Sequence, residues 1–161
     1  NNNSYCQDNE ISWIDWSLLE KNKDLFEFFK FMIDYRKKHP VIRKKLDNAV
    51  CGMEAMHAHD VNAERMEVPQ NAKTLAVSFA GYDRKKGKDD LVYVAVNAYW
   101  EEVKITLPNL ANHGAWYLSV DTYGDEKGKY FYQEGEEIRI DREYVMKPRS
   151  IVVFTGREIL R

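Results

Sequence analysis

The sequence predicts a mainly β protein in which a loop and one long amphipathic helix precede an antiparallel β-sandwich. Two observations lead to this fold class. Apolar residues recur at helical spacing between Leu25 and Ile33, and from Leu75 onward they alternate with polar residues in short runs. Because no second long helical pattern interrupts these runs, parallel strands joined by crossover helices are not expected.

The composition is that of an ordinary globular protein. The chain has 161 residues, 44% of them hydrophobic and 31% charged, and a formal net charge of -2. This length can bury a core without a disulfide or a metal. The small net charge argues against a nucleic-acid partner, and no apolar run reaches the length of a membrane span. Cys6 and Cys51 do not form a dense cysteine framework, so we expect free thiols and a cytoplasmic location.

A loop is expected first, because the polar stretch 1–10 has no apolar period. The chain begins with three asparagines and no methionine, so we expect it to be a piece of a longer protein. Ser17 and Glu20 have the spacing of a capping box and predict the start of a helix, with Asn22 as a competing start.

The predicted helix ends near Lys38, because His39 and Pro40 follow. Its apolar side is unusually rich in phenylalanine, since Phe26 and Phe31 widen the helical face. That face consists of Leu25, Phe28, Phe29, Met32 and Ile33. A helix of this kind needs a large surface to pack on.

The pattern weakens over residues 47–71, which we interpret as a linker into a second unit. A hairpin is expected next, with strands at 75–79 and 91–98 and a charged loop at 81–90 between them. Further strands are predicted by the apolar residues of 103–107, 116–120, 138–140 and 151–154.

Several segments resemble one known family. Residues 1–16, NNNSYCQDNEISWIDW, resemble a signature of the debranching subgroup of the family 13 glycoside hydrolases, the isoamylase and glycogen debranching enzymes of the α-amylase superfamily. The segment 35–41 resembles the end of the last barrel helix of that family. Residues 74–77, 97–101 and 148–154 resemble strands of its C-terminal β-sandwich.

The resemblance implies a division of the chain. Residues 1–46 would be the loop after strand 8 and the last helix of a (β/α)8 barrel, and 47–161 the C-terminal β-sandwich domain. It also implies a parent enzyme that hydrolyses α-1,6 linkages of glycogen or amylopectin with retention, using two carboxyls about 5 to 5.5 Å apart. Those carboxyls lie on earlier barrel strands. We therefore assign no catalytic residue, no metal and no cofactor here, and we expect this chain alone to be inactive.

The implied partners are a branched α-glucan, bound through the intact enzyme, and the protein's own catalytic barrel. Loops at the C-terminal ends of barrel strands build active sites, and amides suit sugar hydroxyls. The candidate substrate-binding residues are Asn2, Asn3, Tyr5, Gln7, Asp8 and Asn9. The alternative is that these side chains only tie down the barrel rim. Trp13 and Trp16 are interpreted as core anchors.

Two alternative functions belong to other classes. Exposed aromatics could make the β domain a carbohydrate-binding module that acts independently of hydrolysis; the candidates are Tyr82, Tyr99, Trp100, Trp116, Tyr117, Tyr123, Tyr130 and Tyr132. His57, His59 and Asp60 could bind a transition metal, because alternate residues of a strand point the same way. The plainer interpretation of this cluster is a polar loop at the domain junction.

Overall fold

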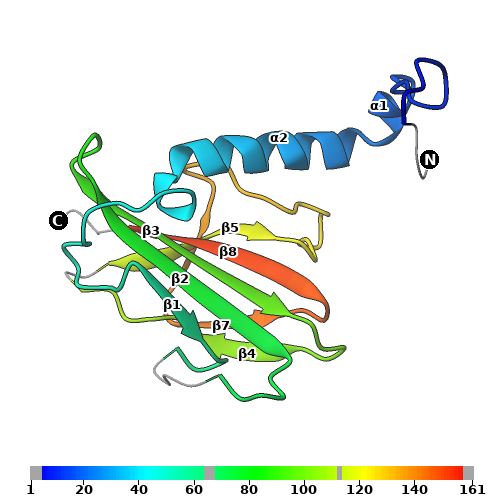
Figure 1. The fold of residues 1–161 in the computed structure, drawn as a ribbon. Helices are drawn as coiled ribbons and strands as arrows, with labels where there is room; N and C mark the ends of the chain where they lie inside the picture. The colour runs from blue at the N-terminus through cyan, green and yellow to red at the C-terminus, as the bar shows by residue number, and fades with distance from the viewer. Residues whose placement is uncertain (1–4, 64–67, 112–113, 158–161) are drawn as a thin grey trace.

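One long helix leads into eight β-strands within residues 5–63, 68–111 and 114–157, the part of the chain that the computed structural model describes (Figure 1). In chain order the elements are α1 (Leu18–Lys21), α2 (Lys23–Lys38), the 3-10 helix η1 (Pro40–Ile42), β1 (Met56–His59), β2 (Thr74–Asp83), β3 (Lys88–Asn97), β4 (Val103–Thr106), β5 (Ala115–Asp121), β6 (Ile138–Ile140), β7 (Glu143–Met146) and β8 (Ser150–Arg157). The strands of both sheets pair antiparallel. The predicted fold class, a mainly β chain with an antiparallel sandwich after an amphipathic helix, is confirmed.

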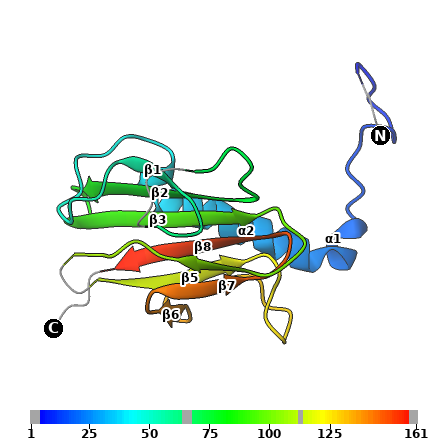
Figure 2. The same cartoon turned by 90° about the horizontal axis from the view of Figure 1, so that it is seen from below.

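The larger sheet has six strands in the order β1-β2-β3-β8-β5-β6 (Figure 2). β4 pairs with β7 to form the smaller sheet (Figure 1). β8, the last of the described strands, lies between β3 and β5 and so occupies the interior of the sheet. β2 and β3 form a long hairpin whose turn is confined to residues 84–87. Gly87 has a φ of 66° there, a conformation that glycine adopts without steric cost.

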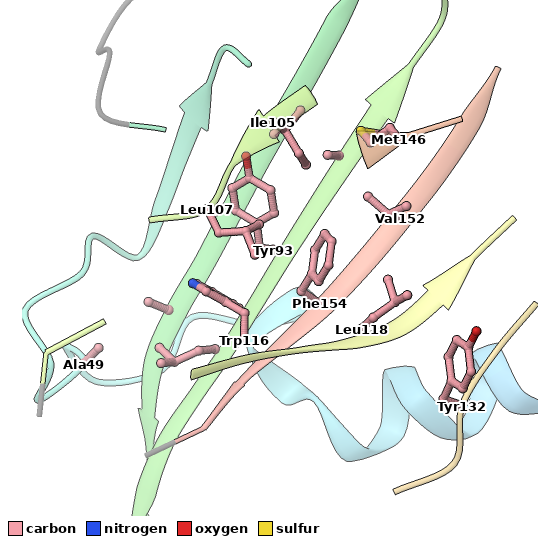
Figure 3. Close-up of a cluster of buried hydrophobic side chains, with 14 residues drawn as sticks. Ala49, Tyr93, Ile105, Leu107, Trp116, Leu118, Tyr132, Met146, Val152 and Phe154 are labelled. Carbon is pink, nitrogen blue, oxygen red and sulfur yellow. The ribbon is translucent and has the colours of Figure 1, made fainter. Parts of the chain in front are cut away.

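The first core lies between the two sheets (Figure 3). Tyr93 from β3, Trp116 from β5 and Phe154 from β8 are at most 2% exposed and form its centre. The smaller sheet contributes Ile105 and Met146, which are fully buried. Successive side chains of a strand point to opposite faces. In β3, β5 and β8, the residues next to Tyr93, Trp116 and Phe154 therefore point to the other side of the larger sheet.

The second core lies on that other side, beneath α2 (Figure 1). Its buried members come from the helix end and the central strands: Tyr35, Val41, Val92, Val120 and Val153. Phe28, Phe31 and Met32 pack against them from α2, and the ring of Phe31 stacks on that of Phe131 at 4.5 Å between centroids. The domain therefore has three layers, with the larger sheet in the middle.

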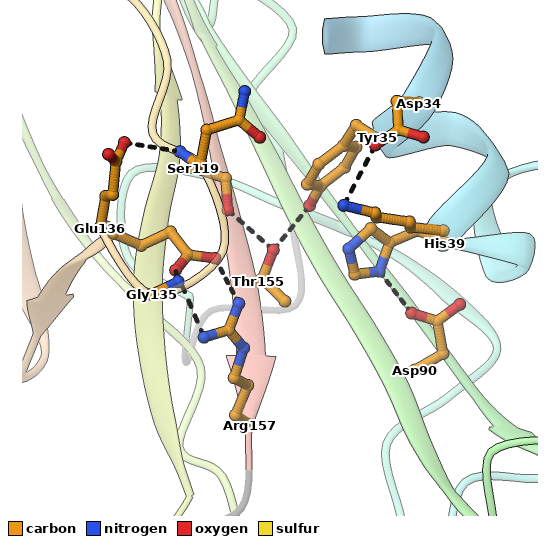
Figure 4. Close-up of polar contacts among 12 residues, drawn as sticks. Asp34, Tyr35, His39, Asp90, Ser119, Gly135, Glu136, Thr155 and Arg157 are labelled. Atoms are coloured by element: carbon orange, nitrogen blue, oxygen red, sulfur yellow. Dashed lines mark hydrogen bonds and ion pairs between the residues drawn. The ribbon is translucent and has the colours of Figure 1, made fainter.

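A buried hydroxyl chain fixes α2 on the sheet (Figure 4). The Tyr35 hydroxyl lies 2.8 Å from Oγ1 of Thr155, which in turn lies 2.8 Å from Oγ of Ser119. Ser119 sits at the β-bulge of β5, where the register shifts between Leu118 and Val120. Burial raises the pKa of Tyr35 well above its usual range, so the phenol stays neutral.

A second polar contact fixes the end of α2 (Figure 4). The buried carboxylate of Asp90 accepts hydrogen bonds from Nδ1 of His39 at 2.6 Å and from the backbone N–H of Val41 at 3.0 Å. At the hairpin tip, the Lys86 ammonium donates to the carbonyl of Lys38. These bonds satisfy backbone groups that the helix end leaves free and join them to the start of β3.

The predicted helix end at Lys38 is confirmed, but the predicted capping box is wrong. Ser17 makes no capping bond; its hydroxyl donates to the Asp15 carboxylate at 2.5 Å, which lowers the pKa of Asp15. The helix is instead divided at Asn22, the competing start, where φ is −113° and ψ is 32°. The long apolar pattern thus belongs to α2 alone.

The interpretation of residues 47–71 as a linker is only partly correct. Ala49 is buried in the first core, and the Asp89 carboxylate accepts hydrogen bonds from the backbone of Val50 and Cys51, each at 2.8 Å. β1 follows and pairs with β2 along the sheet edge. Its His-Ala-His sequence has no alternation of large apolar and polar residues, so this strand was not predicted. β7 was also not predicted, and the hairpin loop is shorter than expected.

Substitution of Tyr35 tests the attachment of α2. Tyr35→Ala should lower the free energy of unfolding by about 3–5 kcal/mol, because it empties a buried aromatic site. Tyr35→Phe should cost only about 1 kcal/mol, since Thr155 keeps Ser119 as a partner. Urea unfolding followed by tryptophan fluorescence measures both. Arg36→Ala, at the exposed neighbouring position, is the control, and an equal effect of Tyr35→Ala and this control would refute the attachment.

Candidate functional site

The predicted sugar-contacting loop is held by its own side chains. Asn2 and Asn3 lie outside the described residues. The side-chain amide of Asn9 donates to Oε1 of Gln7 at 3.2 Å, while its Oδ1 accepts from the backbone of Ile11 at 3.0 Å. The indole N–H of Trp13 donates to the Asp8 carboxylate at 2.9 Å. The structure thus brings Gln7, Asp8 and Asn9 together in one turn. This arrangement agrees with the alternative that these side chains only hold the loop in place at the barrel rim.

These loop contacts leave polar atoms at the surface. Tyr5 is 82% exposed, and Gln7 and Asp8 are exposed as well. A sugar hydroxyl can still donate to a carboxylate or amide oxygen that already accepts one bond, because each such oxygen has two lone pairs. Contact of Tyr5, Gln7, Asp8 and Asn9 with substrate stays a prediction.

Large apolar side chains are exposed from the loop along α2. We call this surface the open apolar face, and it consists of Ile11, Trp13, Ile14, Trp16, Leu18, Leu19, Leu25, Phe26, Phe29 and Ile33. Phe29 and Trp16 are 59% and 72% exposed. Apolar patches of this size usually mark an interface.

The helix α2 consequently has two apolar faces. Phe28, Phe31 and Tyr35 follow one another at helical spacing and point to the sheet, whereas Phe29 and Ile33 lie on the open apolar face. The sequence predicted a single wide apolar face for α2. In the structure one part of it packs on the larger sheet, and the other part is exposed.

A cavity of about 640 Å³ lies between the C-terminal half of α2, the β2–β3 hairpin tip and residues 132–137. Several of its ionisable groups are paired with one another. Asp34 pairs with Lys38 at 3.1 Å, and the buried carboxylate of Glu137 pairs with Arg157 (Figure 4). Asp90 is bound to the helix end, as described above. Among these carboxylates, Asp90 is the one that joins the end of α2 to the sheet.

The His57 and His59 pair lies on β1, with ring centroids 4.7 Å apart. Both nitrogens of His59 have protein partners: Nδ1 donates to the Ala63 carbonyl at 3.2 Å, and Nε2 accepts from the Ser78 hydroxyl at 2.9 Å. Nδ1 of His57 lies 3.1 Å from the Glu54 carboxylate. Within the described ranges, no cluster of three or more His, Cys, Asp or Glu residues is arranged to hold a metal ion. His59 is best described as a buried structural histidine.

The eight candidate aromatics of the β domain differ in exposure. Trp116 and Tyr132 are buried in the first core, and Trp100 and Tyr123 are the exposed members. The others are half-buried: Tyr82, Tyr99, Tyr117 and Tyr130. Sequence spacing could not separate these groups, because aromatics of both kinds occur within and beside strands.

Tyr99 and Trp100 form a pair at the end of β3. Their ring centroids are 4.3 Å apart at an interplanar angle of 38°. The ammonium of Lys73 lies 4.0 Å from the Tyr99 ring and 5.1 Å from the Trp100 ring, within the range of cation–π attraction. Lys73 was not predicted, because it comes from the turn before β2 and only the hairpin brings it to this end.

No helix in the described part of the chain combines the length and apolar character needed to cross a bilayer.

Comparison with known proteins identifies the β domain. Residues 51–155 match the family described as isoamylase, C-terminal. The chain belongs to the isoamylase C-terminal family. The match begins within the segment that leads to β1 and ends inside β8, so it contains β1 to β7 and the first six residues of β8. The resemblance seen in the sequence is confirmed.

Individual relatives of this isoamylase C-terminal chain match different parts of it. Isoamylase 3, chloroplastic, from Oryza sativa is 30% identical over 123 residues, which are 76% of this chain and 14% of that protein. An isoamylase from a Flavobacterium species is 27% identical over an alignment of 177 positions, covering 98% of this chain and 22% of that protein. A glycogen operon protein GlgX homolog from Mycobacterium tuberculosis is 53% identical over 45 residues, 28% of this chain. The chain spans 6% to 22% of the length of these relatives.

The pH dependence of stability tests the assignment of His59. Burial lowers the pKa of His59 below its ordinary value of 6.5, so the unfolded chain binds more protons than the folded one below that pH. The contribution of neutral His59 is therefore complete above pH 6.5 and is lost as the pH falls through the lowered pKa. His59→Gln should flatten this decline in urea unfolding curves. His57→Gln, which removes only the smaller repulsion between the two rings, should flatten it much less. An unchanged decline in His59→Gln would contradict the assignment.

Proposed function

We propose that this isoamylase C-terminal chain is part of an enzyme that hydrolyses α-1,6 branch linkages of glycogen or amylopectin with retention of configuration. The observation that carries the proposal is the family match across β1 to β7 and most of β8. The printed names of the relatives, isoamylase and glycogen operon protein, support it. A cytoplasmic location fits this role and remains a prediction.

In this proposal, residues 1–46 complete the catalytic barrel and 47–161 are the sandwich that supports it. The open apolar face supports the first part, because the last helix of a barrel must cover the barrel strands. The junction at Asp47 is supported by backbone contacts, since the Asp47 carbonyl accepts from Tyr82 of β2 at 2.9 Å. α2 would then be shared by the barrel and the sandwich.

The chemistry belongs to the barrel of the intact protein. Retention requires a nucleophilic carboxylate and an acid–base carboxyl about 5 to 5.5 Å apart. Asp8 is engaged by the Trp13 indole and serves the loop fold, so we do not assign it to catalysis. In this proposal the role of the chain is chiefly structural. The proposed contacts to the glucan, at the rim of the cleft, are Tyr5, Gln7, Asp8 and Asn9.

A reducing-end assay on glycogen tests the proposal. The intact protein, produced from the gene extended upstream, is compared with the 161-residue chain. We expect linear chains to be released by the intact protein only. Absence of release by the intact protein would refute the debranching activity, and release by the short chain would refute the location of the carboxylates.

A charge placed on the open apolar face tests the structural role. Phe29→Asp in the intact protein should lower folding yield and the melting temperature before it changes substrate preference. Burial of a large side chain contributes about 1.5–3 kcal/mol, and this contribution would be lost. Lys30→Gln makes the same change in charge on the flank of α2 and should have little effect. Normal yield and melting temperature for Phe29→Asp would contradict docking of this face on the barrel.

A further inference from the structure

The Tyr99 and Trp100 pair is an exposed aromatic surface that neither core uses. Trp100 is 62% exposed, although exposure of an indole to water is unfavourable. The half-buried Tyr99 ring supports it from one side, and the Lys73 ammonium lies over both rings. The indole is thus held in a defined orientation while it remains accessible.

The turn that carries the pair is fixed by a buried amide. Asn97 is 1% exposed; its Nδ2 donates to the carbonyls of Glu101 and Lys147 at 2.9 and 3.0 Å, and its Oδ1 accepts from the backbone of Tyr99 at 3.0 Å. The backbone N–H of Arg149 donates to the Tyr99 carbonyl at 3.0 Å, and Arg149 has a φ of 51°. A non-glycine residue in this conformation is uncommon and must be held by its surroundings.

The pair lies at the end of the domain where α2 begins. β3 starts beside the C-terminal end of α2, where Asp90 binds His39, and runs ten residues to Asn97, a span of roughly 33 Å. Both views show the end of β3 directed to the side where α1 and the N-terminal loop lie (Figures 1 and 2). In a (β/α)8 barrel the start of a helix marks the active-site side.

The charged groups around the pair are of both signs, so neither an anionic nor a cationic ligand is favoured. The cation at the rings is Lys73, and Arg149, bonded through its backbone to Tyr99, is also exposed. Glu101 follows Trp100 in the chain, and the nearby Glu102 and Lys147 form an ion pair with each other. An ordered, exposed indole with polar groups beside it suits a sugar ring, whose C–H face packs on the aromatic ring while its hydroxyls meet donors and acceptors.

We propose that Tyr99 and Trp100 form a second glucan-binding site, at which an unbranched α-1,4-linked chain of the polysaccharide stacks while another part of the same molecule occupies the cleft. This inference rests on the proposed function. Occupation of two sites by one polymer raises the effective concentration of the second contact, so the site acts on large glucans and not on short ones.

The experiment uses the intact protein with Trp100→Ala, Trp100→Phe and Met56→Ala, the last a truncation of an exposed apolar side chain on β1. Binding to glycogen is measured by affinity electrophoresis. Hydrolysis is measured with two substrates, glycogen and a short branched maltooligosaccharide. Stability is measured as the melting temperature. Trp100→Ala should weaken glycogen binding about tenfold, with Trp100→Phe recovering most of it. Hydrolysis of the short substrate and the melting temperature should not change, and Met56→Ala should behave as wild type.

Unchanged glycogen binding by Trp100→Ala would overturn the inference. Equal losses on both substrates with a lower melting temperature would also overturn it, because Trp100 would then be packed on the barrel. If the wild-type protein binds glycogen but releases no chains, the debranching proposal fails, and the dependence of binding on Trp100 still decides the second site.

Discussion

The larger sheet is apolar on both faces, and the rest of the structure depends on covering both. Alternation along β3 sends Tyr93 into the sandwich core and Val92 to the opposite side, and neighbouring Phe154 and Val153 of β8 divide in the same way. The smaller sheet covers only one side. α2 is therefore required to exclude water from the other, and the Tyr35 hydroxyl chain fixes its position there.

This arrangement makes α2 an integral part of the sandwich, although the family match begins after it. A helix that uses one face for the sandwich and offers another to the barrel would couple the stability of the two units. Phe28 and Phe29 are adjacent in the chain and belong to different faces. In the proposed enzyme, the sandwich holds the last barrel helix from outside and so stabilises the barrel without contributing catalytic groups.

Much of the fold could be predicted, because its signals are local. The end of α2 follows from Pro40, and most strands follow from alternation of apolar residues. β1 could not be predicted, since its position at the edge of the sheet needs no apolar face. The division of α2 into two faces could not be predicted either, because the sheet and the proposed barrel would both be contacted by large apolar side chains. For the candidate site, the family resemblance located the loop, whereas contacts such as Lys73 on Tyr99 depend on the hairpin register and leave no sequence pattern.

Amide hydrogen exchange along α2, measured in the 161-residue chain and in the intact protein, tests most directly whether this helix is shared. Residues 35–41 are bound to the sandwich by Tyr35, His39 and the Val41 amide, so they should be protected in both. Residues 18–27 precede Phe28, the first α2 residue that packs on the sheet, and carry Leu18, Leu19, Leu25 and Phe26 of the open apolar face. They should gain strong protection only in the intact protein, where the barrel covers that face. Equal protection of 18–27 in the two proteins would contradict the shared helix.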